Sequence, residues 1–244
     1  MQEFETRTVS RTGAGARAEV DVGLRSYMLR VYNYMALGVA WTAIVALFMA
    51  GNPNLMMTIA MGPAKWVLFI AILALGWFAP RIIFSGSAAM AYGAYALYAT
   101  LWGVLISPMI AFFMGTHPEL IVRALLITAI TFGATSLAGY VTKRDLSGFA
   151  GFFMMASIGL LIAIVVNALF FQSEMMSLIT SILVVLVFAG VTAWETQSIK
   201  EMYVAGDLDD VARSKAIFGA FMLYGSFVTM FIHILNILGI MSED

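Results

Sequence analysis

Glu195 is the residue of this sequence with the clearest capacity for chemistry, because it stands at the end of a long apolar run. A carboxylate inside a membrane-embedded helix costs about 2.5–3.5 kcal/mol, so such a residue indicates a function. It can contact a cation or exchange a proton, and either role suits a gate. The structural alternative is a side chain that reaches from the end of its helix to the water interface.

A second group of polar side chains lies in the last apolar stretch of the chain. They are separated by three, four and three positions, which places them on one face of a helix: Ser226, Thr229, His233 and Asn236. Thr192 shares a face with Glu195 in the preceding apolar stretch. Such a stripe either lines a wet path or joins helices by hydrogen bonds, and the sequence leaves both interpretations open.

The sequence contains no arrangement typical of an enzyme. Ser226 and His233 are seven residues apart, so on one helix they are separated by about 10 Å and form no dyad unless another helix supplies the base. A Gly-rich phosphate loop, a His cluster with metal-ligand spacing and a nucleophile elbow are all missing from the sequence. We therefore expect no catalysis, no metal site and no cofactor.

The composition is that of an integral membrane protein. Of all residues, 62% are hydrophobic and 11% are charged, and the mean hydropathy is +0.94. Soluble domains are usually about 45–50% apolar and about 25% charged. The net charge of −1 and the lack of a basic stripe argue against binding to nucleic acid.

The apolar runs predict an all-α protein, because backbone groups in lipid must be hydrogen bonded within a helix. Each run is long enough to cross a hydrocarbon core about 30 Å thick. Residues 1–27 are expected to form a polar, mostly flexible cytoplasmic tail, and residues 28–244 a transmembrane domain. The seven expected helices cover residues 28–50, 64–84, 88–114, 120–141, 148–171, 175–195 and 215–240.

The basic residues predict the orientation in the membrane. All Lys and Arg except Lys65 and Arg123 fall in the N-terminal tail or in alternate loops on the same side. Because cytoplasmic loops carry the excess of Lys and Arg, we expect the N-terminus in the cytoplasm and the C-terminus outside. Clusters of small residues, among them Gly139 on the fourth helix and Gly151 and Gly159 on the fifth, predict close helix packing.

Three separate motifs resemble those of the Bax inhibitor family. They are FGATSLAGYVTKRDL at residues 132–146, WETQSIKEMY at 194–203 and LYGSFVTMF at 223–231. The resemblance extends over nearly the whole chain, and the basic N-terminal tail is similar to that of bacterial members. It implies a bundle with a central last helix, located in the bacterial inner membrane.

The resemblance also implies a function and shows where this sequence departs from the family. Family members are implicated in pH-dependent calcium leak, with two aspartates that share a proton. Here Glu195 replaces the first aspartate, Ser226 the second, and Thr229 replaces a family asparagine. Arg81, near the end of the second helix, is the candidate partner for Glu195.

Two functions follow from these observations. The first is a cation leak channel, with calcium as the expected ion and a modified gate formed by Glu195, Arg81 and Ser226. The second is a non-conducting regulator that binds another membrane complex such as a quality-control protease, because the second acid of the pair is missing.

Overall fold

The computed structural model describes residues 2–85 and 87–242, and these residues form helices and connections without strands. Seven helices are long and apolar enough to cross a membrane, so the predicted all-α, multi-pass fold is confirmed. The elements are α1 (Gln2–Ala50), α2 (Pro53–Met61), α3 (Ala64–Ile83), α4 (Ala88–Thr116), α5 (Pro118–Val141), the 3₁₀ turn η1 (Ser147–Phe149), α6 (Ala150–Val166), the π-helical turn η2 (Asn167–Phe171), α7 (Glu174–Glu201) and α8 (Asp209–Ile240).

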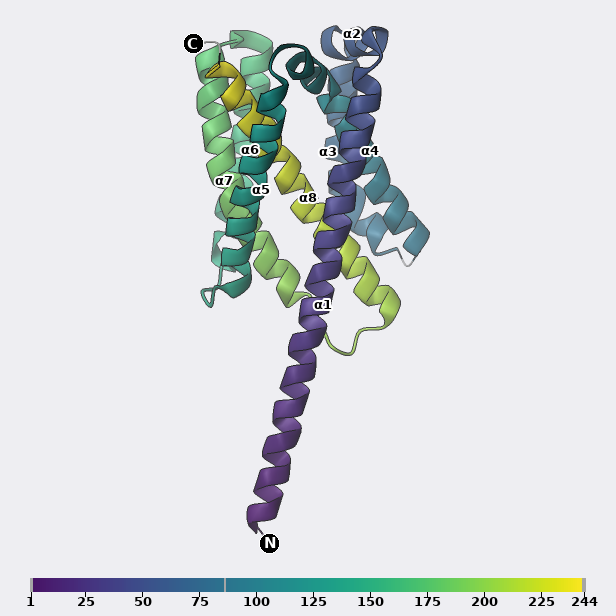
Figure 1. Ribbon diagram of the computed structural model, residues 1–244, viewed down its shortest axis with the longest axis vertical. Coiled ribbons are helices and arrows are strands. Elements are labelled where there is room, and N and C mark those ends of the chain that lie inside the picture. Colours follow the sequence, from purple (N-terminus) through teal and green to yellow (C-terminus); the bar gives the residue numbers. More distant parts are fainter. Residues whose placement is uncertain (1, 86, 243–244) are drawn as a thin grey trace.

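The first helix is longer than the sequence predicts. α1 begins at Gln2 and extends well beyond the bundle, and its apolar part covers Val22–Ala50 (Figure 1). The segment expected to be a flexible tail is therefore helical in this structure. No proline interrupts residues 1–27, and Ala, Arg and Glu favour the helix there. The division of the chain into a tail and a membrane domain stays a prediction.

A short helix, α2, follows the predicted turn at residues 51–53. The Asn52 side chain accepts a hydrogen bond from the backbone N–H of Leu55, and Pro53 occupies the first helical position. Both features favour the start of a helix. The residues that end α1 thus also begin α2, which the hydropathy pattern did not predict.

The helix α8 lies at the centre of the bundle, as the resemblance implies. In its apolar window 61% of the residues are buried, and it packs against α1, α3, α4, α5 and α7. Figure 1 shows α8 crossing diagonally between the other helices. The fifth span differs, because none of the residues in its window is buried and α6 packs on α7. The last helix is therefore central, but α6 lies at the edge of the bundle.

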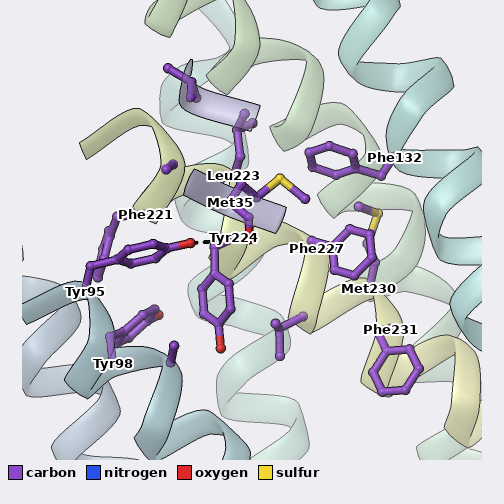
Figure 2. Close-up of a cluster of buried hydrophobic side chains, with 14 of the residues drawn as sticks. Met35, Tyr95, Tyr98, Phe132, Phe221, Leu223, Tyr224, Phe227, Met230 and Phe231 are labelled. Atoms are coloured by element: carbon purple, nitrogen blue, oxygen red, sulfur yellow. Dashed lines mark hydrogen bonds between the residues drawn. The ribbon is translucent and has the colours of Figure 1, made fainter. Parts of the chain in front are cut away.

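Aromatic side chains surround the middle of α8 (Figure 2). Tyr224 is fully buried, and its hydroxyl lies 2.6 Å from the hydroxyl of Thr42 on α1. The rings of Tyr98 on α4 and Phe221 on α8 are 4.4 Å apart between centroids. Aromatic pairs at such distances stabilise a core beyond the burial of their area. The Tyr224–Thr42 contact thus holds α8 against α1, and the Tyr98–Phe221 pair holds it against α4.

The predicted packing of small residues is correct on one helix and wrong on another. At Gly139 of α5 a Cβ atom would overlap the backbone of Ala193, so the absence of a side chain permits close contact with α7. At Gly148, Gly151 and Gly159 a Cβ atom would meet no atom within 4 Å. Since α6 is at the edge, its glycines do not mediate close approach.

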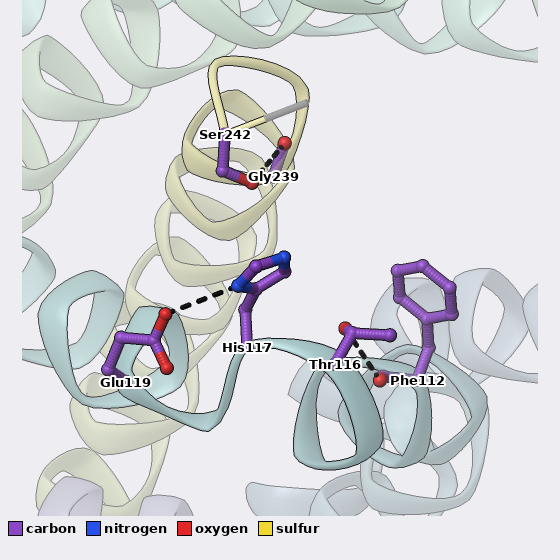
Figure 3. A network of polar contacts seen from close by, with 6 residues as sticks. All are labelled: Phe112, Thr116, His117, Glu119, Gly239 and Ser242. Carbon is purple, nitrogen blue, oxygen red and sulfur yellow. Dashed lines mark hydrogen bonds and ion pairs between the residues drawn. The ribbon is translucent and has the colours of Figure 1, made fainter. Parts of the chain in front are cut away.

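The C-terminal end of α8 lies near the connection between α4 and α5. A Cβ atom at Gly239 would overlap the ring of Phe113 on α4. In this connection, His117 Nδ1 and Glu119 Oε1 are 3.3 Å apart (Figure 3). Both side chains are about half exposed, so we assign the contact little stabilisation.

Candidate functional site

Glu195 and Ser226 meet inside the bundle. Glu195 lies within α7, which continues to Glu201, and only 8% of its surface is exposed. The Ser226 hydroxyl on α8 donates a hydrogen bond of 2.7 Å to Glu195 Oε2. The carboxyl group is therefore enclosed between helices and does not reach the water interface. Ser226, which replaces the second acid of the family, is its direct partner.

The residues that follow Glu195 attach α7 to its neighbours. The hydroxyl of Thr196 is 2.9 Å from that of Ser136 on α5, and Ser136 is 2.7 Å from the hydroxyl of Tyr32 on α1. This chain of hydroxyl groups joins three helices just beyond Glu195. It restricts the rotation of α7 and so helps to keep Glu195 directed toward α8.

Gln197 holds the connection between α5 and η1. Its side chain accepts from the backbone N–H of Leu146 at 2.7 Å and donates to the backbone oxygen of Arg144 at 2.9 Å. Within this loop, hydrogen bonds from the Ser147 side chain and backbone lower the pKa of Asp145. Two of the quoted motifs, which are far apart in the sequence, thus contact each other directly. The sequence analysis did not propose Thr196 or Gln197 as site residues, although both belong to the motif at residues 194–203.

A cavity of about 450 Å³ separates α1 from α5, and a larger one of about 670 Å³ adjoins Glu195. The larger cavity extends along α8 and has walls from α3, α4, α6 and α7. Four of the predicted site residues line it: Glu195, Ser226, Thr229 and His233. Glu195 is the only acid among the lining residues, and Lys and Arg are absent from this lining within the described part of the chain. The sequence did not indicate Tyr98 or Trp102, which also line the cavity, because aromatic residues in an apolar run carry no special signal.

The polar stripe of α8 divides into two parts. Its C-terminal part bonds to α7, because Asn236 Nδ2 donates to the hydroxyl oxygens of Ser177 at 2.9 Å and Ser181 at 3.0 Å. His233 Nδ1 also lies 2.9 Å from the Ser181 hydroxyl. We call Ser177, Ser181, His233 and Asn236 the serine clamp. The C-terminal part of the stripe therefore joins helices, Ser226 and Thr229 line the cavity, and His233 does both.

Thr192 does not contribute to the cavity. It is fully buried, and its hydroxyl donates to the backbone oxygen of Phe188 on the same helix at 2.8 Å. It shares the face of Glu195 by position, but its polar group is used within α7.

Arg81 is not brought to Glu195. It lies in the last turn of α3, directly after Pro80, and its side chain is exposed. The ion pairs formed by the described residues are His117–Glu119, Arg213–Asp210 and Lys215–Asp207, and none includes Arg81. The expected contact is wrong for this structure, because the end of α3 directs Arg81 away from the bundle interior.

Comparison with known proteins shows similarity over nearly the whole chain. The profile of the family described as "Inhibitor of apoptosis-promoting Bax1" matches residues 24–243. The Rickettsia prowazekii protein RP147 is 37% identical over 96% of this chain and 97% of its own length. A protein of Deinococcus radiodurans is 38% identical over 88% of this chain and 90% of its own. The inner membrane protein YbhL of Escherichia coli is 36% identical over 89% of this chain and 92% of its own.

Proposed function

The chain belongs to the Bax inhibitor family, and from this premise we propose that it is a pH-modulated leak channel for cations, with calcium as the expected ion. The observation that carries the proposal is the position of Glu195. Its carboxyl group lies on the wall of a cavity inside the bundle and receives one hydrogen bond, from Ser226. A buried acid beside a cavity is typical of an ion pathway in a membrane protein.

The proposed gate differs from a pair of carboxyl groups. With Ser226 as partner, Glu195 is the one acid among the described residues that line the cavity, so it is the group there that can supply a negative charge for a cation. Protonation of Glu195 removes this charge, and protonation of His233, which faces the same cavity, adds a repelling one. We therefore expect cation flux to fall as the pH is lowered and to rise as the pH is raised.

The proposed location is the bacterial inner membrane, with the N-terminus in the cytoplasm and the C-terminus outside. The similarity to YbhL, which is an inner membrane protein, supports the location in the inner membrane. The distribution of Lys and Arg supports the orientation of the termini. The proposed role is conduction and involves no catalysed reaction.

The test is calcium flux into liposomes that hold the purified protein and a calcium dye. Glu195→Gln keeps the shape of the side chain but removes its charge, so we expect flux to fall about tenfold, the effect of losing about 1.4 kcal/mol of cation attraction. The remaining flux of this variant should lose the part of the pH dependence that comes from Glu195. Glu201→Gln, an exposed acid at the end of the same helix, is the matched control. Equal flux and an equal pH profile for wild type and Glu195→Gln would exclude Glu195 as the gate.

A non-conducting regulator is the second proposed function, and the extension of α1 favours it. The N-terminal part of α1 projects beyond the bundle (Figure 1), where a partner such as a membrane protease can reach it. Purification from native membranes, with the co-purifying proteins identified, tests this function. A chain that lacks residues 2–21 should lose its partner but keep its fold. Full-length protein that purifies alone and conducts calcium would contradict this role.

A further inference from the structure

The cavity beside Glu195 is suited to an apolar occupant. Its volume of about 670 Å³ far exceeds the ~30 Å³ that one water molecule takes in the liquid. Apart from a few polar side chains, most of them on α7 and α8 and one, Ser157, on α6, the lining consists mainly of aliphatic and aromatic side chains from five helices. Apolar cavities of this kind bind apolar ligands in preference to water. A ligand that fills the space must therefore be largely hydrophobic.

The cavity opens sideways, between α3 and α6. In Figure 1 these helices belong to different sides of the bundle, with α8 between them. α3 packs against α2, α4 and α8, whereas α6 packs against α7. Leu73 on α3 and Ile158 on α6 both line the cavity, yet they are 45% and 51% exposed. In a membrane this opening faces the lipid, so the ligand can enter from the bilayer.

Glu195 supplies the acidic group of the cavity. Glu195 is the only acid in the lining, and no lysine or arginine from the described residues balances it there. Ser226 bonds to Oε2, while Oε1 accepts no hydrogen bond from the described part of the chain. One carboxyl oxygen thus stays available to a positively charged ligand.

Aromatic rings complete the recognition site. Phe69, Tyr98, Trp102, Phe188 and Phe221 line the cavity from α3, α4, α7 and α8. The ring centroids of Tyr98 and Trp102 are 6.4 Å apart, at nearly a right angle. Aromatic faces attract cations, and the attraction increases when water is excluded. A carboxyl group with several aromatic rings suits an organic cation, which brings its own apolar surface.

We infer that this cavity binds a monovalent lipophilic cation, a quaternary ammonium or phosphonium compound, which enters from the bilayer between α3 and α6 and places its charge at Glu195. This site shares Glu195 with the proposed leak but requires no conduction. An inorganic cation must bring its hydration water into the cavity, whereas a lipophilic cation brings its own apolar surface and needs none.

The experiment measures equilibrium binding of radiolabelled tetraphenylphosphonium to the purified full-length protein in detergent. We expect saturable binding at one site per chain. Glu195→Gln should weaken binding about tenfold or more, because it removes the charge partner. The control Glu201→Gln should bind as wild type does.

A second variant tests the site without touching Glu195. Gly76 on α3 lines the cavity, and a Cβ atom there would meet no atom within 4 Å. Gly76→Phe should fill the cavity and abolish binding without lowering the melting temperature. Gly151→Phe, at an equally open position on α6, should leave binding unchanged.

Three results would overturn the inference: no saturable binding by wild type, equal affinity of Glu195→Gln, or normal binding by a stably folded Gly76→Phe variant. Binding without calcium flux would support this site and contradict the leak. Calcium flux that depends on Glu195, without binding of tetraphenylphosphonium, would support the leak and overturn this site.

Discussion

Two polar sites connect α7 and α8, and they differ in the number of hydrogen bonds that join the two helices. In the serine clamp, Asn236 donates to both Ser177 and Ser181, and Ser181 also bonds to His233. At the other site, Glu195 receives one hydrogen bond from Ser226 and faces a large cavity. Several hydrogen bonds between two helices restrict their relative movement, whereas an acid with one such bond beside a cavity remains available to a ligand. Similar residue types therefore join the helices at one site and line a cavity at the other.

Among the substitutions that test the difference between the two sites, replacement of Ser226 by aspartate should have the largest effect on calcium flux. Ser226→Asp places a second carboxyl group within hydrogen-bond distance of Glu195, and two such groups cannot both ionise easily. The pair should titrate in two steps. We expect the change of calcium flux across a pH titration in liposomes to increase about tenfold, equivalent to about 1.4 kcal/mol between protonation states. Ser226→Asn is the uncharged control, and a profile shared by the two variants would contradict the expected coupling.

Loss of the serine clamp should affect stability and leave conduction nearly unchanged. Asn236→Leu removes the donor to Ser177 and Ser181, and hydrogen bonds between membrane helices contribute about 0.6 kcal/mol on average and at most about 1.7 kcal/mol. We expect a loss of that size in the free energy of unfolding, measured in detergent. A double-mutant cycle with Ser181→Ala should show coupling between the two residues. A large loss of calcium flux in a stable Asn236→Leu protein would place the clamp on the pathway.

The smallest effect is expected at Thr192, between the two sites. Thr192→Val keeps the shape of the side chain and removes a hydroxyl that bonds only to Phe188 of its own helix among the described residues. Since replacement by an apolar group of the same shape can be nearly neutral, we expect about 0.5 kcal/mol or less of destabilisation and unchanged flux. Thermal unfolding and liposome flux measure these two quantities. A tenfold loss of flux would show that Thr192 belongs to the pathway.

The candidate site could be predicted from the sequence only in part. Glu195 was evident as an acid in an apolar run, and the spacing of Ser226, Thr229, His233 and Asn236 correctly placed these residues on the inner helix. The predicted pairing of Glu195 with Arg81 was wrong, because the position of a residue near a loop does not determine the direction in which its side chain points. Tyr98 and Trp102 were missed, because an aromatic residue in an apolar run looks the same in a cavity wall and in a packed core.

The sequence by itself determined the class of fold, the number of membrane helices and the presence of a buried acid. These features depend on local composition, since a helix that crosses lipid must be long, apolar and internally hydrogen bonded. Only the tertiary structure decided that Ser226 contacts Glu195, that the polar stripe of α8 is shared between a cavity and a clamp, and that α6 lies at the edge. Those features depend on how each helix is rotated and crossed against its neighbours, and the periodicity of a single helix does not contain that information.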